Sequence, residues 1–212
     1  MASEVPALSR SGSITRSSVP VSLTYPEYRE YLRYDFFYSC AYCTMSEAEA
    51  QAIRFTIDHY EPRNARPDLL DEYENLMYSC GECNLRKGDR SPPPKARADG
   101  YRFFRPDRDL HEDHFEESRR RLQGKSNVGR YPIEALDLNR LALQRLREIR
   151  QRLTECHCLV VEGVLGLRKF PIDRLPPNVR GRALRAINRA GAAGIKIADA
   201  IDSLLRNYAR RR

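Results

Sequence analysis

Two Cys-x-x-Cys pairs stand out in the sequence, Cys40/Cys43 and Cys80/Cys83. Each pair can form a turn that points two sulfurs at one ion, and four thiolates complete a tetrahedral Zn²⁺ site. A closed site of this kind has no open coordination position, so we expect the zinc to be structural. The segment after Met1 has no apolar signal region, which predicts a reducing, cytoplasmic location where cysteines at this spacing are usually metal ligands.

Four polar residues lie between or directly after these pairs, namely Asp58, His59, Asn75 and Asn84. A carboxylate and an amide oxygen can hold Mg²⁺ or Mn²⁺, with water and substrate phosphate completing the coordination. A neutral imidazole beside that cation can deprotonate an attacking water. Taken alone, each residue is better explained without catalysis: Asp58 and the two asparagines as turn or capping residues, and His59 as a histidine whose hydrogen bonds are satisfied. Together, inside the cysteine pairs, they predict hydrolysis of a phosphodiester bond.

The spacing of these residues resembles that of the HNH endonucleases of the ββα-metal type. Three motifs carry the resemblance: Asp58-His59-x-x-Pro62, Asn75-Leu76 and Cys80-x-x-Cys83-Asn84-x-x-Lys87-Gly88-Asp89. The resemblance implies that His59 is the general base, that Asp58 is a ligand of a catalytic cation and that Asn75 fixes the catalytic loop. The third motif position is often His in the family and is Asn84 here, where we expect a second metal ligand. An oxygen-only pair favours Mg²⁺ over softer metals.

A ββα unit, two strands followed by a helix, must position the candidate catalytic residues. We expect strands at 54–58 and 76–79 and a helix at 81–87, preceded by a helix that starts at 24–27 and runs to about residue 35. Asp58 and His59 would face opposite sides of a regular strand, so the strand must end or bend there. The expected fold class is α+β, an HNH core stapled by a Cys₄ zinc site with a mainly α-helical C-terminal region.

We divide the chain into a flexible N-terminal tail at 1–22, the nuclease core at 23–90, a Pro-rich linker and mixed segment at 91–130 and a basic helical region at 131–212. In the last region we expect a helix at 138–153 and two helices, 181–190 and 195–208, hinged at 191–194. Two further groups, Cys156-His157-Cys158 and the pair His111 and His114, are expected to pack rather than to bind metal.

Charge is distributed unevenly along the chain. The total is +8, but residues 40–90 carry a net charge of −4 and residues 131–212 carry +9. An acidic centre suits cation binding, whereas a basic flank suits a polyanion such as DNA. Arg86, Lys87 and Arg90 come after the second cysteine pair and are expected to contact phosphates. No apolar run reaches the length of about 18 residues that a membrane span requires, so we expect no membrane partner.

A second, shorter resemblance concerns the stretch from Phe103 to Arg140. It is similar to the segment after the nuclease core in small stand-alone HNH proteins of bacterial phage-defence operons. It implies an effector nuclease in anti-phage defence, controlled by a partner protein such as an ATPase or a reverse-transcriptase unit. Two other interpretations stay open: a non-catalytic zinc module that binds nucleic acid through 180–212, and an assembly subunit that uses the helices at 138–153 and 181–208.

Overall fold

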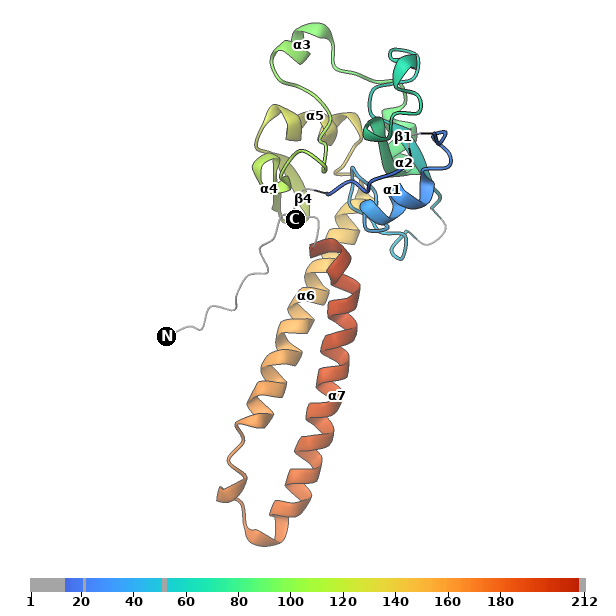
Figure 1. The fold of residues 1–212 in the computed structure, drawn as a ribbon. Helices are drawn as coiled ribbons and strands as arrows, with labels where there is room; N and C mark the ends of the chain where they lie inside the picture. Colours follow the sequence, from blue (N-terminus) through green and yellow to red (C-terminus); the bar gives the residue numbers. More distant parts are fainter. Residues whose placement is uncertain (1–13, 21, 51–52, 210–212) are drawn as a thin grey trace. The chain divides into compact units, whose positions relative to one another are not determined.

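The computed structural model describes residues 14–20, 22–50 and 53–209 of the chain (Figure 1). They form two compact units, one made mainly of residues up to Leu146 and one of Arg147–Arg206. The elements in chain order are α1 (Arg29–Asp35), β1 (Phe55–His59), η1 (Pro67–Leu69), η2 (Tyr73–Asn75), β2 (Leu76–Cys80), α2 (Gly81–Lys87), α3 (Pro94–Ala98), α4 (His111–His114), β3 (Phe115–Ser118), β4 (Arg121–Gly124), α5 (Asn127–Ala135), α6 (Leu141–Arg168), η3 (Ile172–Arg174) and α7 (Pro177–Ala209).

The predicted ββα unit is present in the first compact unit. β1 and β2 pair antiparallel, with His59 opposite Leu76 and Phe55 opposite Cys80, and α2 comes directly after β2. All five residues of β2 are buried. A short, mostly apolar run of this length is typical of a strand that is buried on both faces. α2 ends at Lys87 and is capped by Gly88, whose φ of 47° lies in the region that favours glycine. The predicted mixed α and β class with a helical C-terminal region is confirmed.

The first helix begins later than the sequence predicts but ends where expected. Thr24 donates its backbone N–H and its hydroxyl to the Glu27 carboxylate at 2.8 Å and 2.7 Å, so the predicted capping interaction forms. It closes a turn, and the helix itself starts at Arg29. Leu32 of α1 is fully buried and anchors the helix to the core.

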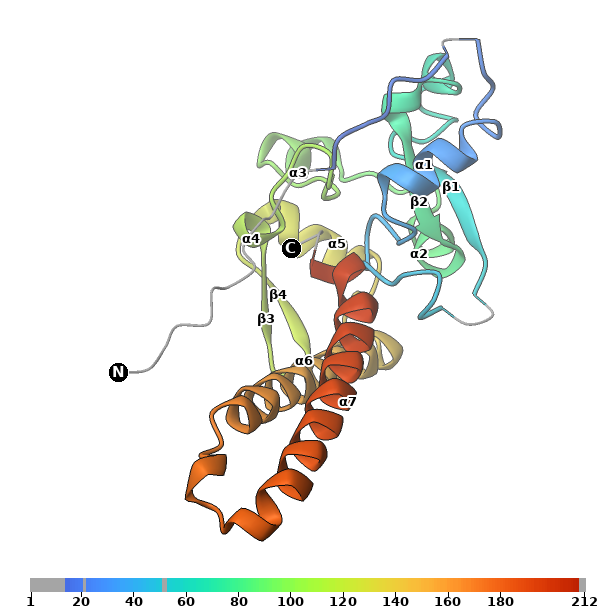
Figure 2. The ribbon, with the colours of Figure 1, turned by 60° about the horizontal axis from the view of Figure 1, so that its bottom comes forward.

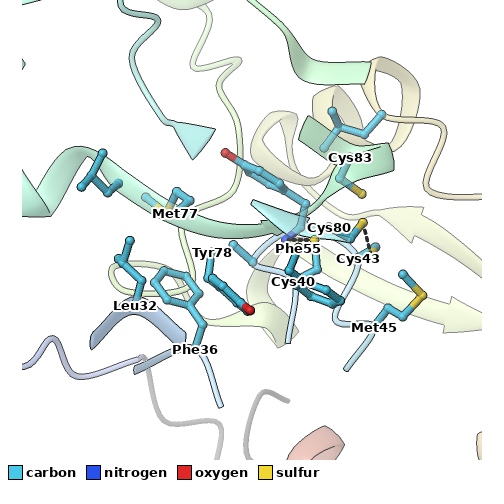
Figure 3. Close-up of a cluster of buried hydrophobic side chains, with 14 of the residues drawn as sticks. Leu32, Phe36, Cys40, Cys43, Met45, Phe55, Met77, Tyr78, Cys80 and Cys83 are labelled. Carbon is cyan, nitrogen blue, oxygen red and sulfur yellow. Dashed lines mark hydrogen bonds between the residues drawn. The ribbon is translucent and has the colours of Figure 1, made fainter. Parts of the chain in front are cut away.

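The main hydrophobic core lies between α1 and the β1–β2 hairpin. Leu32, Phe36, Met77 and Tyr78 are buried there, next to the four cysteines of the paired motifs (Figure 3). Phe55 stacks on Tyr78 with ring centroids 5.2 Å apart. Burial of one such side chain contributes about 1.5–3 kcal/mol. This core therefore gives the hairpin a rigid base on which the polar residues of β1 are held.

A second hairpin, β3 and β4, lies in the segment that we assigned as a Pro-rich linker and mixed segment. Its two-residue turn is Arg119-Arg120, with φ of 46° and 74°. Such turns usually carry Asn, Asp or Gly, so an Arg-Arg pair gives no hairpin signal. Gly129 of α5 packs so closely against the His114 backbone carbonyl that a Cβ would overlap it. Glycine is therefore needed at this contact.

The second compact unit is a pair of long helices that lie side by side (Figures 1 and 2). The predicted hinge at 191–194 is wrong, because α7 continues unbroken through both glycines. Each glycine costs about 1 kcal/mol relative to alanine, which a long helix tolerates. A Cβ at Gly194 would lie 2.5 Å from Cγ2 of Val164, so this glycine lets α7 approach α6 closely.

Several other expectations fall on these helices and on the N-terminus. The helix expected at 138–153 runs from Leu141 to Arg168, and Cys156 and Cys158 are exposed on it rather than packed. Residues 1–13 and 21 of the predicted tail and residues 210–212 lie outside the described residues. Ile14 is only 4% exposed. The domain boundaries that we assigned remain a prediction. Among the described residues, no helix combines the length and apolar character needed to cross a membrane.

Candidate active site and metal centre

The four cysteines of the paired motifs form one buried cluster. Their sulfur atoms all lie within 4.8 Å of one another, and Sγ of Cys43 is 3.8 Å from Sγ of Cys80. Ligands about 2.3 Å from a tetrahedral Zn²⁺ are separated by about 3.8 Å, so the cluster fits zinc. Cys40 and Cys43 come from the loop before β1, while Cys80 and Cys83 come from the β2–α2 junction. A bound zinc would hold these segments together.

Arg140 supplies positive charge beside this cluster. Its Nη2 donates to Sγ of Cys83 at 3.7 Å, and its Nε lies 2.7 Å from the Glu82 carboxylate without hydrogen-bond geometry. Burial alone would lower the pKa of Arg140, but the nearby Cys83 and Cys43 thiolates raise it above its usual value. Four thiolates on one Zn²⁺ carry excess negative charge, and a buried guanidinium offsets part of it.

His59, the predicted general base, is the last residue of β1 and is buried. Its Nε2 lies 2.9 Å from the carbonyl oxygen of Leu70, and its ring meets that of Tyr25 edge-on at 5.0 Å. A carbonyl only accepts, so Nε2 carries the proton and Nδ1 of the neutral ring is left as an acceptor. Burial lowers the pKa of His59 below 6.5, which favours this neutral form.

Asn75 fastens the loop that connects β1 to β2. Its Oδ1 accepts from the backbone N–H of Glu61 at 2.9 Å, and its Nδ2 donates to the carbonyls of Glu61 and Leu69, each at 3.2 Å. Leu69 is the neighbour of Leu70, whose carbonyl holds the His59 ring. Asn75 therefore acts on His59 through the loop and does not line the same pocket.

Asp58 is buried between two side chains that the sequence did not link to it. The Tyr42 hydroxyl donates to its Oδ2, and the ammonium of Lys87 lies 3.1 Å from the carboxylate. Lys87 also donates to the His59 carbonyl at 2.6 Å. Burial raises the pKa of Asp58 to about 6, although Lys87 and Tyr42 act in the opposite direction.

Asp58, His59 and Asn84 line one pocket of about 170 Å³. In a regular strand, Asp58 and His59 would face opposite sides, so we expected the strand to end or bend there. β1 does end at His59, and both residues line the pocket. Asn84 Nδ2 donates to the Thr56 hydroxyl at 2.8 Å, so α2 is fixed on β1. Asp89, to which we assigned no role from its motif position, lines the same pocket.

The oxygen atoms at this pocket fit a hard divalent cation. An ionised carboxylate has about four acceptor positions. In Asp58, two donors, the Tyr42 hydroxyl and the Lys87 ammonium, occupy part of them, so the carboxylate can still accept a cation. Asn84 engages its Nδ2 with Thr56, which leaves the amide oxygen for a ligand. Oxygen donors of this kind suit Mg²⁺ or Mn²⁺.

The three cations expected at the phosphates are placed differently from one another. Lys87 is fully buried on Asp58, so it acts inside the core and not at the surface. Arg86 lies 3.6 Å from the Asp137 carboxylate, and Arg90 donates to the Ala135 carbonyl at 3.0 Å.

His111 and His114 pack with Phe104, as expected. Among the described residues, only the four-cysteine cluster has a metal-ligating arrangement of His, Cys, Asp and Glu.

A larger cavity of about 700 Å³ lies beside the same loop. Tyr60, Glu61, Arg97 and Phe103 are among its lining residues. Neither His59 nor Asp58 reaches it, and two of its arginines, Arg102 and Arg105, are bound to aspartates. We therefore assign the chemistry to the smaller pocket.

The part of the chain that holds this pocket is similar to known proteins. Residues 40–90 match the family model described as HNH endonuclease, and this part of the chain is an HNH endonuclease domain. The chain is also similar to the Septu protein PtuB of Bacillus thuringiensis, with 26% identity over 102 residues. That match covers 48% of this chain and 37% of PtuB, so the chain spans just over a third of the relative's length. No solved structure matches the chain.

Proposed function

We propose that this protein is a metal-dependent endonuclease that hydrolyses phosphodiester bonds of DNA. The observation that carries the proposal is the pocket in which His59, fixed through Nε2, meets Asp58 and Asn84. An imidazole with one fixed donor and one acceptor nitrogen is suited to general base catalysis beside a cation held by oxygen ligands.

In the proposed reaction, Nδ1 of His59 takes a proton from a water molecule, whose oxygen attacks the scissile phosphorus. The bond from phosphorus to the leaving oxygen breaks, and that oxygen takes up a proton. Asp58 and Asn84 would hold Mg²⁺ or Mn²⁺, which when bound stabilises the charge that develops on the phosphate. The lowered pKa of His59 keeps the base neutral near pH 7.

The remaining residues of the domain support this arrangement. Zinc on the four cysteines would hold α2, and with it Asn84, against β1. Asn75 positions the Leu69–Leu70 backbone, which in turn orients His59. Loss of zinc should therefore abolish cleavage although zinc takes no part in the reaction.

A role as the effector nuclease of a bacterial anti-phage system, acting with a partner protein in the cytoplasm, is part of this proposal. The resemblance to defence-operon HNH proteins and the similarity to PtuB support it.

The proposal is tested by incubating plasmid DNA with the purified chain in Mg²⁺, in Mn²⁺ or in EDTA. We expect cutting in at least one of the two metals and none in EDTA. The His59→Ala variant should cut the plasmid at least about 10²-fold more slowly while it retains zinc and DNA binding. A wild-type protein that binds DNA and zinc but leaves the plasmid intact in both metals would contradict cleavage by the isolated chain, and the same assay with the partner protein would then separate a controlled nuclease from a non-catalytic module.

A further inference from the structure

A stripe of cations runs along α7. Arg182, Arg185, Arg189 and Lys196 are spaced three, four and seven residues apart and are all exposed. With 100° per residue, these spacings place the four side chains within an arc of about 60°. At a rise of 1.5 Å per residue, the stripe is about 21 Å long.

These four cations are not engaged in ion pairs within the described residues. In the described part of the chain none of them lies within 4.0 Å of a carboxylate, whereas Arg33, Arg66 and Arg152 are ion-paired. Arg180 of the same helix differs from the four stripe residues, because it donates hydrogen bonds to the carbonyls of Leu175 and Asp173 at 2.7 Å and 2.8 Å.

Charge repulsion makes the stripe costly for the isolated protein. Like charges three or four residues apart lie next to each other on a helix surface and destabilise it. Arg182, Arg185 and Arg189 have this spacing, and the first turn of α7 has no acidic residue. The first acidic residue of α7 is Asp199. An unpaired row of like charges at this position is better explained by a ligand than by stability.

The opposite face of α7 is already used for packing. Leu184, Ile187 and Ile195 line the cleft toward α6, and Gly194 approaches Val164. The cation stripe is on the other side of the helix from these residues by helical geometry, so it faces away from α6. It is therefore accessible within this unit without any rearrangement of the helix pair.

We propose that Arg182, Arg185, Arg189 and Lys196 form a phosphate-binding stripe through which α7 holds the backbone of DNA. The proposal rests on the function proposed above, since it names the element that retains the substrate. Exposed, unpaired arginines in a row match the regular negative charge of a DNA backbone, and contacts of this type are independent of base sequence. The stripe would therefore add affinity without sequence preference.

The test measures binding of a fluorescently labelled DNA duplex by anisotropy over a series of salt concentrations. All proteins are full-length and carry His59→Ala, with no divalent cation added, so that no cutting occurs. The stripe variant combines Arg182→Gln, Arg185→Gln and Arg189→Gln. The control combines Arg152→Gln, Arg168→Gln and Arg174→Gln, which removes the same charge from the same unit away from the stripe. Helix content is compared by circular dichroism.

Each lost phosphate contact lowers the slope of log K against log salt by about 0.9, so we expect the stripe variant to lose between about 2 and 3 in slope. The control should lose less than about 1. Equal losses in both variants would show a response to net charge alone and would overturn the proposal. Unchanged binding in the stripe variant, or no DNA binding by the parent protein, would overturn it as well. Because binding is measured without cleavage, a failure of nuclease activity remains distinguishable.

Discussion

Replacement of Asn75 by alanine should loosen the loop that orients His59. The side chain is buried and makes three hydrogen bonds, one from the Glu61 N–H at 2.9 Å and two to the carbonyls of Glu61 and Leu69 at 3.2 Å. A bond of this kind contributes about 1 kcal/mol net, so Asn75→Ala should lower the free energy of unfolding by about 3 kcal/mol.

The same change should also slow cleavage beyond what unfolding explains. Leu69 precedes Leu70, whose carbonyl accepts from Nε2 of His59 at 2.9 Å. If this backbone moves, the ring loses its fixed orientation, and a displacement of about 1 Å at a catalytic group costs about 10²-fold in rate. The variant should therefore show this loss even under conditions where it is fully folded.

Urea unfolding at constant zinc, followed by circular dichroism, measures the stability change, and DNA cleavage measures the rate. Asn75→Asp keeps an acceptor for the Glu61 N–H but presents a carboxylate to two carbonyls, so it should not rescue either property. Asn64→Ala, an exposed site on the same loop, serves as the control. An Asn75→Ala protein within about 1 kcal/mol of wild type, or one that cuts at the wild-type rate, would refute the reasoning.

Other contacts of the site lead to three further predictions. Lys87→Met leaves Asp58 as a buried, uncompensated charge and should lower the free energy of unfolding in urea by about 3–5 kcal/mol. Adding Asp58→Asn to this variant should restore much of that loss. Additive losses of the two single variants would contradict the pairing. Arg140→Ala should weaken zinc binding about 10- to 100-fold in a chelator competition, whereas Arg145→Ala should leave it unchanged. Because burial lowers the pKa of His59, the cleavage rate should rise with pH through a midpoint below 6.5 and level off above it; a midpoint above 6.5 in a pH–rate profile would contradict a buried neutral base.

The elements of the ββα unit could be predicted from the sequence, because the residue patterns that indicate them lie within the elements themselves. The alternation at Phe55 and Ile57 and the helix after the second cysteine pair placed β1, β2 and α2 within about one residue. The cysteine spacing likewise indicated the four-sulfur cluster, which the structure confirms. In each of these cases, the residues that determine the element lie inside it or directly beside it.

The errors came from contacts that sequence neighbours do not reveal. The glycines of α7 indicated a hinge, but Gly194 serves the approach of α6, a helix some 30 residues away. Lys87 was expected to contact a phosphate, yet its ammonium is buried on Asp58, which lies 29 residues earlier. The contact of Arg140 with Cys83 spans 57 residues and has no motif of its own. Partners of buried charges depend on tertiary packing, which spacing alone does not encode.

The central claim is that the zinc-stapled pocket at His59 catalyses hydrolysis of DNA. The most direct test is the single-turnover cleavage rate in saturating Mg²⁺ or Mn²⁺ for wild-type and His59→Ala proteins that contain equal zinc and bind DNA equally. General base catalysis contributes about 10²–10⁴-fold, so the variant should be slower by at least about 10²-fold. A His59→Ala protein that cuts at the wild-type rate would contradict the claim, because the proton would then be taken by another group.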